Sequence, residues 1–285
     1  MMSRQYHYFI AGLPDLHFGE FKEWTTLPSF YRTLRRELHP TDYQQVSLVL
    51  LKEDHEHLLN FLQTGEIHQA KHGNFTLDEF REQISLFSAI LPSDDILPQY
   101  MVNVLRRYEE KEVEPDFVLY SHELATGYYH HINQHGSAFL KTYTRFDYDM
   151  NNLLAFLKAR EYGLDPKRFI TGNSGLAAHL LQSSEEIITV DPEFEWFEEL
   201  SALACISPFS DAELKMDQLR WKVIDDLIFF EEFSIDWILG YLQKMLIVAR
   251  WAHLDTTTGE KKLRKLTEKP VHAFHMESET DINAS

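Results

Sequence analysis

Two pairs of histidines have the spacing that most directly suggests chemistry. His68 and His72 stand four residues apart, as do His131 and His135. On a helix this spacing places two imidazoles on one face, where they could bind zinc. Neither pair belongs to an HExxH sequence, has a nearby cysteine or has an identifiable third ligand. We therefore predict no metal site, and a metal-dependent enzyme is a second alternative function.

Carboxylates and glycines offer two further kinds of chemistry. The adjacent pairs Asp225/Asp226 and Glu231/Glu232 would point about 100° apart on a helix, so they indicate a solvated edge rather than paired catalytic acids. The turn at 171–175 contains Gly172 and Gly175 but lacks the Lys-Ser/Thr ending and the preceding strand of a phosphate loop. No GxSxG motif is present. We predict no catalytic residue and no cofactor.

Charge limits the partners that the chain can bind. The 285 residues have a formal net charge of −18, which repels phosphate backbones, so we predict no nucleic-acid partner. Residues 182–236 carry 15 Asp/Glu against three basic residues. This segment is either a solvated acidic face or a docking surface for a basic partner.

The cysteine content and the hydropathy of the chain indicate a cytoplasmic location. The single cysteine, Cys205, lies in an apolar run and cannot form an internal disulfide, which fits a reducing cytosol. The chain has no run of about 18 apolar residues, and its first residues lack the pattern of a signal peptide. We expect a cytoplasmic protein that reaches a membrane only through partner proteins.

Hydrophobic periodicity predicts a mainly α fold with many helices, arranged in lobes, and at most a few short strands. Residues 6–13 are too short for the period to separate strand from helix. Thr41 is the expected cap of one helix and Gly65 its stop, while Thr76 and Glu79 form a capping-box pattern. The expected helices cover 27–38, 41–64, 76–91, 98–111, 120–145 (with an interruption at Gly127 or Gly136 left open), 146–162, 175–181, 193–204, 210–230 and 235–253.

A charged stretch at 109–116, EEKEVEPD, is the expected boundary between lobes. We predict an N-terminal helical lobe over 1–112 and one or more C-terminal helical lobes over 113–268. The polar tail at 269–285 is predicted to be disordered.

The segment 146–181, FDYDMNNLLAFLKAREYGLDPKRFITGNSGLAAHLL, reads as a helix, a Gly-Leu-Asp-Pro break, a turn rich in Gly and Asn, and a second helix. No nucleophile, metal cluster or phosphate loop stands out within it. Arg160, near the end of the first helix, either extends along the surface or ties this helix to a neighbour through a carboxylate.

This segment resembles a repeated element of the C subunit (the d subunit in eukaryotes) of V/A-type rotary ATPases. In that family an acidic residue and an Asn precede a leucine-rich helix with a basic residue near its end, and a Gly-Leu break follows. The N-terminal YHYFIAGLPDL and the C-terminal ARWAHLDTTTGEKKLRKL also resemble an uncharacterised bacterial family encoded beside V/A-type ATPase subunits. The matching residues are Asp149, Asn151, Asn152, Leu153, Leu154, Lys158, Ala159, Arg160, Gly163, Leu164, Gly172 and Gly175.

The resemblance implies a lobed architecture like that of the C subunit, and a mechanical role without catalysis. It implies that the protein couples the central stalk of a V/A-type ATPase to the membrane rotor ring. The implied partners are the stalk and rotor-ring subunits, and the implied place is cytoplasmic and peripheral to the inner membrane. The alternative is an assembly or regulatory factor that binds the same ATPase through its acidic 182–236 region.

Overall fold

The computed structural model describes residues 4–20, 24–67, 72–87, 95–110, 115–172, 175–182 and 209–254, and over these residues the protein is helical, with no strand. The predicted mainly α fold is confirmed. Residues 6–13, left open between strand and helix, contain a short helix. The elements are α1 (His7–Ala11), α2 (Leu27–Glu37), α3 (Pro40–Thr64), α4 (Leu77–Leu86), α5 (Gln99–Glu110), α6 (Phe117–His135), α7 (Ala138–Glu161), the 3-10 helix η1 (Pro166–Arg168), α8 (Gly175–Gln182), α10 (Phe209–Ile228) and α11 (Ile235–Leu254).

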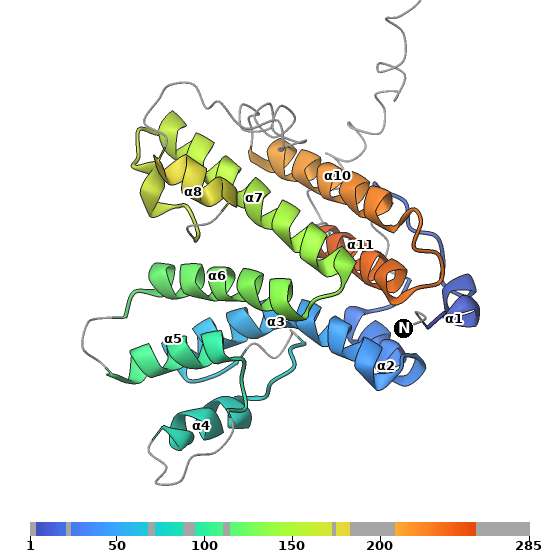
Figure 1. Ribbon diagram of the computed structural model, residues 1–285, viewed down its shortest axis with the longest axis horizontal. Helices are drawn as coiled ribbons and strands as arrows, with labels where there is room; N and C mark the ends of the chain where they lie inside the picture. Colours follow the sequence, from blue (N-terminus) through green and yellow to red (C-terminus); the bar gives the residue numbers. More distant parts are fainter. Residues whose placement is uncertain are drawn as a thin grey trace, which may run out of the picture.

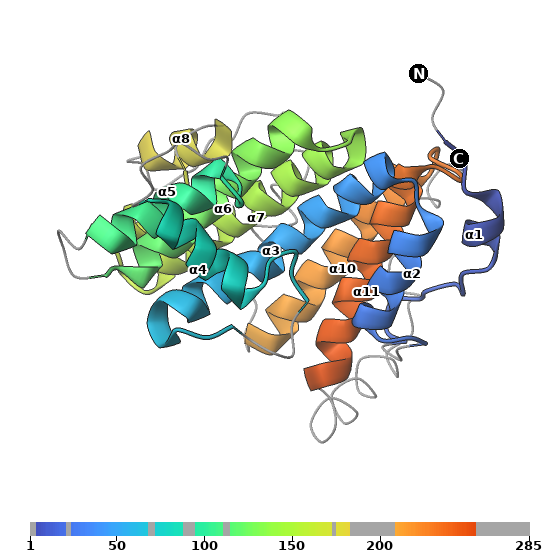
Figure 2. The ribbon, with the colours of Figure 1, turned by 90° about the horizontal axis from the view of Figure 1, so that it is seen from below.

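The helices pack in an order that places α7 in the middle of the molecule. α7 contacts α6, α8, α10 and α11, while α3 contacts α2, α6 and α11. Figure 1 shows α4 and α5 beyond α6 and α3 on one side of α7, with α10 on its other side. Figure 2 shows α2, α11 and α10 side by side. None of the described helices is both long enough and apolar enough to span a membrane.

Local sequence signals explain where several helices begin and end. The Thr76/Glu79 capping box is formed, with both reciprocal bonds present, and Gly65 ends α3 in the left-handed conformation at φ +77°. The prediction that Thr41 caps α3 is wrong. His39 is the cap, and its Nδ1 accepts from the Thr41 amide at 3.2 Å. Pro40 then occupies the first helical position, where the missing amide proton costs nothing.

The predicted helix boundary at 145/146 is also wrong. The chain breaks between α6 and α7 at Gly136, where the backbone is extended. Ser137 caps α7 by accepting from the Leu140 amide at 3.3 Å, and α7 then continues without interruption through Glu161. The sequence 120–145 therefore belongs to two helices.

The buried apolar side chains form two clusters. The larger contains residues of α2, α3, α5, α6, α7, α10 and α11, so it includes positions on both sides of residue 112. The smaller joins α7, α8 and α10 around Met150, Leu153 and Leu176. The division into lobes at 112/113 stays a prediction. The predicted helix at 193–204, Cys205 and the tail at 269–285 lie outside the described residues.

Gly127 lies inside α6, where α6 passes close to α5. A Cβ atom at this position would stand 2.5 Å from the Cβ, Cγ and Cδ2 atoms of Tyr100. Glycine is unfavourable in helix interiors, but the close approach of Tyr100 leaves no room at position 127 for a larger residue.

We expect Gly127→Ala to lower the free energy of unfolding by about 1–3 kcal/mol, because overpacking outweighs the helix preference of alanine. Chemical denaturation measures this change. Gly12→Ala is the matched control, since a Cβ there would meet its nearest atoms at an ordinary 3.5 Å. A Gly127→Ala variant that is more stable than the wild type would contradict the packing argument.

Candidate functional site

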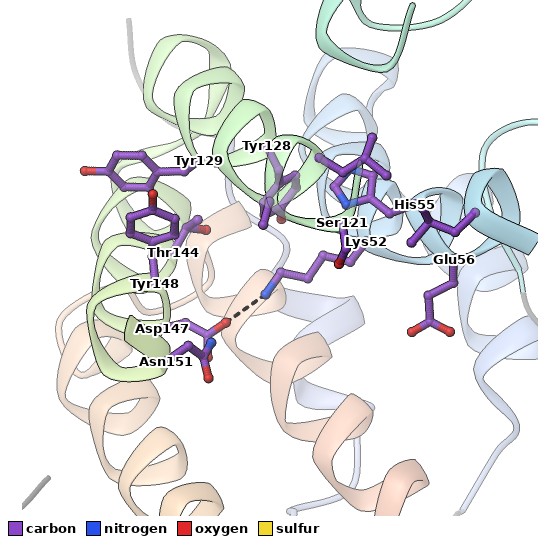
Figure 3. Close-up of a pocket in the computed structure, with 13 residues that line it drawn as sticks. Lys52, His55, Glu56, Ser121, Tyr128, Tyr129, Thr144, Asp147, Tyr148 and Asn151 are labelled. Carbon is purple, nitrogen blue, oxygen red and sulfur yellow. Dashed lines mark hydrogen bonds and ion pairs between the residues drawn. The ribbon is translucent and has the colours of Figure 1, made fainter. Parts of the chain in front are cut away.

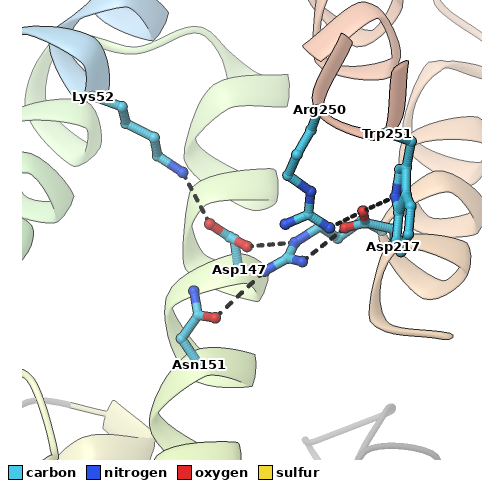
Figure 4. A network of polar contacts seen from close by, with 7 residues as sticks. Lys52, Asp147, Asn151, Asp217, Arg250 and Trp251 are labelled. Atoms are coloured by element: carbon cyan, nitrogen blue, oxygen red, sulfur yellow. Dashed lines mark hydrogen bonds and ion pairs between the residues drawn. The ribbon is translucent and has the colours of Figure 1, made fainter. Parts of the chain in front are cut away.

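The most distinctive arrangement of polar side chains is a network of charges that joins four helices (Figure 4). Asp147 of α7 accepts from the Lys52 ammonium of α3 and from the Arg220 Nε atom of α10, both at 2.9 Å. Arg220 also donates to Asp217, one turn away in α10, at 2.9 Å. Its remaining nitrogen reaches the Asn151 side-chain oxygen at 3.4 Å.

Asp217 extends the network into α11. Its second oxygen accepts from the Trp251 indole at 2.7 Å and is paired with the Arg250 guanidinium. The side chain of Asp217 is only 1% exposed. A carboxylate removed from water in this way needs several donors, and the bonds from Arg220, Arg250 and Trp251 supply them.

The pKa values of the network follow from a competition between burial and charge. Burial raises the pKa of Asp147, but Lys52 and Arg220 outweigh it and hold that pKa well below its usual range. Burial also lowers the pKa of Lys52 and of Arg220, and in both cases the attraction of Asp147 reverses the effect and raises the pKa. All three groups are therefore charged at neutral pH.

A cavity of about 280 Å³ opens beside the network, between α3, α6 and α7 (Figure 3). The Lys52 ammonium lies 5.6 Å from the centre of the Tyr128 ring. Behind it, the His55 imidazole and the Tyr100 hydroxyl are 2.7 Å apart. The lining residues are Lys52, His55, Glu56, Leu59, Ser121, Leu124, Ala125, Tyr128, Tyr129, Thr144, Asp147, Tyr148 and Asn151.

Two of the lining side chains, Lys52 and His55, have shifted pKa values. The Lys52 amine is kept protonated by Asp147, so it is not a nucleophile. Burial lowers the pKa of His55 to about 3, so its imidazole is neutral and a weak base at neutral pH. Lys52 joins α3 to α7 through its ion pair with Asp147, and His55 joins α3 to α5 through its contact with Tyr100.

Asn152, one of the predicted site residues, anchors the turn that follows α7. Its side chain accepts from the Thr171 amide at 2.8 Å and donates to the Thr171 carbonyl at 3.1 Å. Gly172 has φ +76°, and a Cβ there would come within 1.8 Å of the Tyr148 hydroxyl. Gly175 also has a positive φ, of +56°. These residues shape the α7–α8 hairpin.

The other predicted site residues make local contacts along α7 and at its C-terminal end, where the Gly163 amide donates to the Arg160 carbonyl at 3.1 Å. Gly163 ends α7 at φ +66°, and Lys158 is paired with Glu161 at 2.7 Å. Arg160 is exposed, with its guanidinium 5.6 Å from the ring centre of Phe156 on its own helix. Asp149 is 3.8 Å from Arg145 on the same helix. Asn151 is the one predicted site residue in the charge network.

Sequence reasoning missed the centre of the network. Asp217 belongs to the segment interpreted as a surface, yet it is buried. A signal was present in the sequence. Leu214, Trp221 and Ile224 form an apolar stripe at helical spacing, and Asp217 lies within this stripe. Asp147 likewise falls in the stripe of Tyr143 and Met150. A charge inside an apolar stripe indicates a buried ion pair.

The structure describes only part of the two histidine pairs. His68 lies outside the described residues. The His131 and His135 rings are 4.6 Å apart between centroids, and burial lowers the pKa of His131. Within the described ranges, no three His, Cys, Asp or Glu side chains gather as metal ligands would.

The fold and this site define a helical protein whose polar centre connects helices. Comparison with protein families adds no activity to this description. The family model DUF2764, a protein family of unknown function, matches residues 2–273, and the chain belongs to this family. No curated protein and no solved structure matches the chain.

We expect Asp147→Asn to lower the free energy of unfolding by about 3 kcal/mol or more, because Lys52 and Arg220 lose their shared anion. Since the folded-state pKa of Asp147 is depressed, its contribution is present above the unfolded pKa of about 3.9 and disappears as pH falls. Urea denaturation at pH 7 and at pH 3 should show a smaller difference at pH 3.

Glu161→Gln is the matched control for the Asp147 variant. It breaks the exposed Lys158–Glu161 pair on the same helix, and such surface pairs contribute about 0–1 kcal/mol. If both variants lost the same free energy of unfolding, the buried network would contribute no more to stability than an exposed ion pair.

Asp149 offers the opposite pH dependence. Burial raises its pKa to about 6, although Arg145 acts against this. The folded state then binds a proton more tightly than the unfolded chain, so this contribution is full at about pH 4 and is lost as pH rises through about 6. We expect Asp149→Asn to gain about 2 kcal/mol relative to wild type between pH 4 and pH 7.5. Parallel stability curves would contradict this.

Proposed function

We propose that this protein is a non-catalytic subunit, or subunit-like partner, of a V/A-type rotary ATPase that couples the central stalk to the membrane rotor ring. The observation that carries the proposal is the 146–181 segment. In the structure this segment is an α7–α8 hairpin whose turn is held by Asn152 and shaped by Gly163, Gly172 and Gly175. These are residues on which the resemblance to the ATPase C subunit rests.

The charge network supports a mechanical role. A coupling protein transmits force between two partners, so its helices must not slide past one another. Interdigitated apolar side chains resist such sliding, and directional charge-assisted bonds add to this resistance because they hold donor and acceptor at fixed positions. The network ties α3, α7, α10 and α11 together at one place, which suits an element of this kind. On this proposal the protein is cytoplasmic and peripheral to the inner membrane.

The alternative is an assembly or regulatory factor of the same ATPase. It is favoured by the exposed carboxylates of Asp225, Asp226, Glu231 and Glu232 in the acidic segment. A factor held by exposed charges would leave the complex at high salt, because exposed charges are screened.

Purification of the membrane ATPase from native cells in mild detergent, with quantitative mass spectrometry, tests the proposal. We expect this chain at a fixed ratio to the rotor and catalytic subunits, before and after a high-salt wash. Substoichiometric recovery that salt removes would favour the assembly factor. Complete absence would refute both roles.

A variant series can show whether the α7 end takes part. We expect Arg160→Glu, at an exposed site matching the family's basic residue, to lower recovery of the chain with the ATPase. Arg36→Glu is the control, because Arg36 is a 75% exposed arginine near the end of α2. Both variants should keep the melting temperature of the wild type.

A further inference from the structure

The turn between α10 and α11 exposes two large aromatic side chains to solvent. Phe229 is 70% exposed and Phe230 is 88% exposed. Their rings are in edge-to-face contact, with centroids 4.7 Å apart. Two adjacent phenylalanines left in water at one turn form an apolar surface that a partner can cover.

This turn is held firmly in place. Phe233 adopts φ +62°, a conformation that a bulky residue rarely takes. Its carbonyl accepts from the Tyr6 amide at 2.7 Å, and its ring lies 4.2 Å from the His7 ring. Ser234 donates to the Glu231 carbonyl at 2.8 Å and accepts from the Trp237 amide. Figure 1 shows α1 beside this turn. The two phenylalanines are therefore presented by a fixed backbone.

Four carboxylates flank the aromatic pair in the sequence. Glu231 and Glu232 follow it directly, and Asp225 and Asp226 precede it by less than two helical turns; all four are exposed. Among these, Asp225 is paired with Lys244. The turn thus carries two exposed phenylalanines with exposed carboxylates next to them in the chain, and an apolar centre with a polar rim is the usual layout of a specific interface.

We propose that Phe229, Phe230 and the surrounding carboxylates form a docking surface for a basic amphipathic helix of another protein. Leucine-type side chains of such a helix cover the phenylalanines, and its lysines or arginines meet the acidic rim. A second copy that docks through the same surface would place like charges together. An anionic membrane would repel the rim. A partner of this chemistry suits either role proposed above.

Peptide binding to the full chain tests the proposal without the ATPase. The probe is a fluorescein-labelled peptide of leucine and lysine with a helical 3–4 spacing, and the second peptide has glutamate in place of lysine. Fluorescence anisotropy at physiological ionic strength should show saturable binding of the lysine peptide only. Absence of saturable binding, or equal binding of both peptides, would overturn the proposal.

Variants locate the binding on the chain. Phe229→Ser/Phe230→Ser should weaken binding by about tenfold or more, because buried aromatic side chains dominate interfaces. The matched control, Tyr162→Ser/Phe169→Ser, removes two other exposed aromatic side chains and should change binding less than about twofold. Glu231→Gln/Glu232→Gln should weaken binding and flatten its salt dependence. Equal losses in the two aromatic double variants would overturn the proposal.

Photo-crosslinking identifies the natural occupant. With p-benzoylphenylalanine in place of Phe230, ultraviolet light links the turn to whatever covers it in the native cell, and mass spectrometry sequences the linked segment. A basic segment of another protein with a helical apolar period supports the proposal. A link to lipid, to an acidic segment, to a second copy or to residues 255–285 of the same chain overturns it.

Discussion

The structure depends on the burial of two carboxylates between helices. Asp147 and Asp217 are both nearly removed from water, and Arg220 reaches both of them. A buried carboxylate is costly unless its donors are complete, so α3 must bring Lys52 and α11 must bring Arg250 to fixed places. Replacing such a network with apolar residues often leaves stability unchanged. Here the network joins α3, α7, α10 and α11 through ion pairs that need each of these side chains in its place.

Helix α7 connects this network with the rest of the molecule. Asp147 lies one turn before the adjacent residues Asn151 and Asn152, and Asn152 holds the Thr171 turn before α8. The N-terminal helices reach α7 through Lys52 and through the larger buried cluster, which includes positions before and after residue 112. Rotation of α7 would thus disturb the charge network and the hairpin together.

The sequence predicted most helices well because periodicity and capping are local signals. It could not place the α6–α7 break, because Gly127 and Gly136 look alike until Tyr100 is seen against the first of them. Only one predicted site residue, Asn151, lies in the network. The partners of Asp147 come from positions 52 and 220, so their meeting is a tertiary event. The acidic composition of residues 182–236 also suggested that their carboxylates are exposed, whereas Asp217 is buried.

The acidic 182–236 segment therefore combines two different kinds of charge. Asp217 is neutralised by arginines and contributes nothing to the outer surface, while Glu231 and Glu232 remain in water beside the exposed phenylalanines. The buried charge fixes α10 against α7 and α11, and α10 and α11 in turn fix the ends of the turn between them. A docking surface gains affinity when it is held before the partner arrives, because less entropy is lost on binding. The buried ions hold the two helices together at one end, and the bonds of Tyr6 and Ser234 hold the turn at the other.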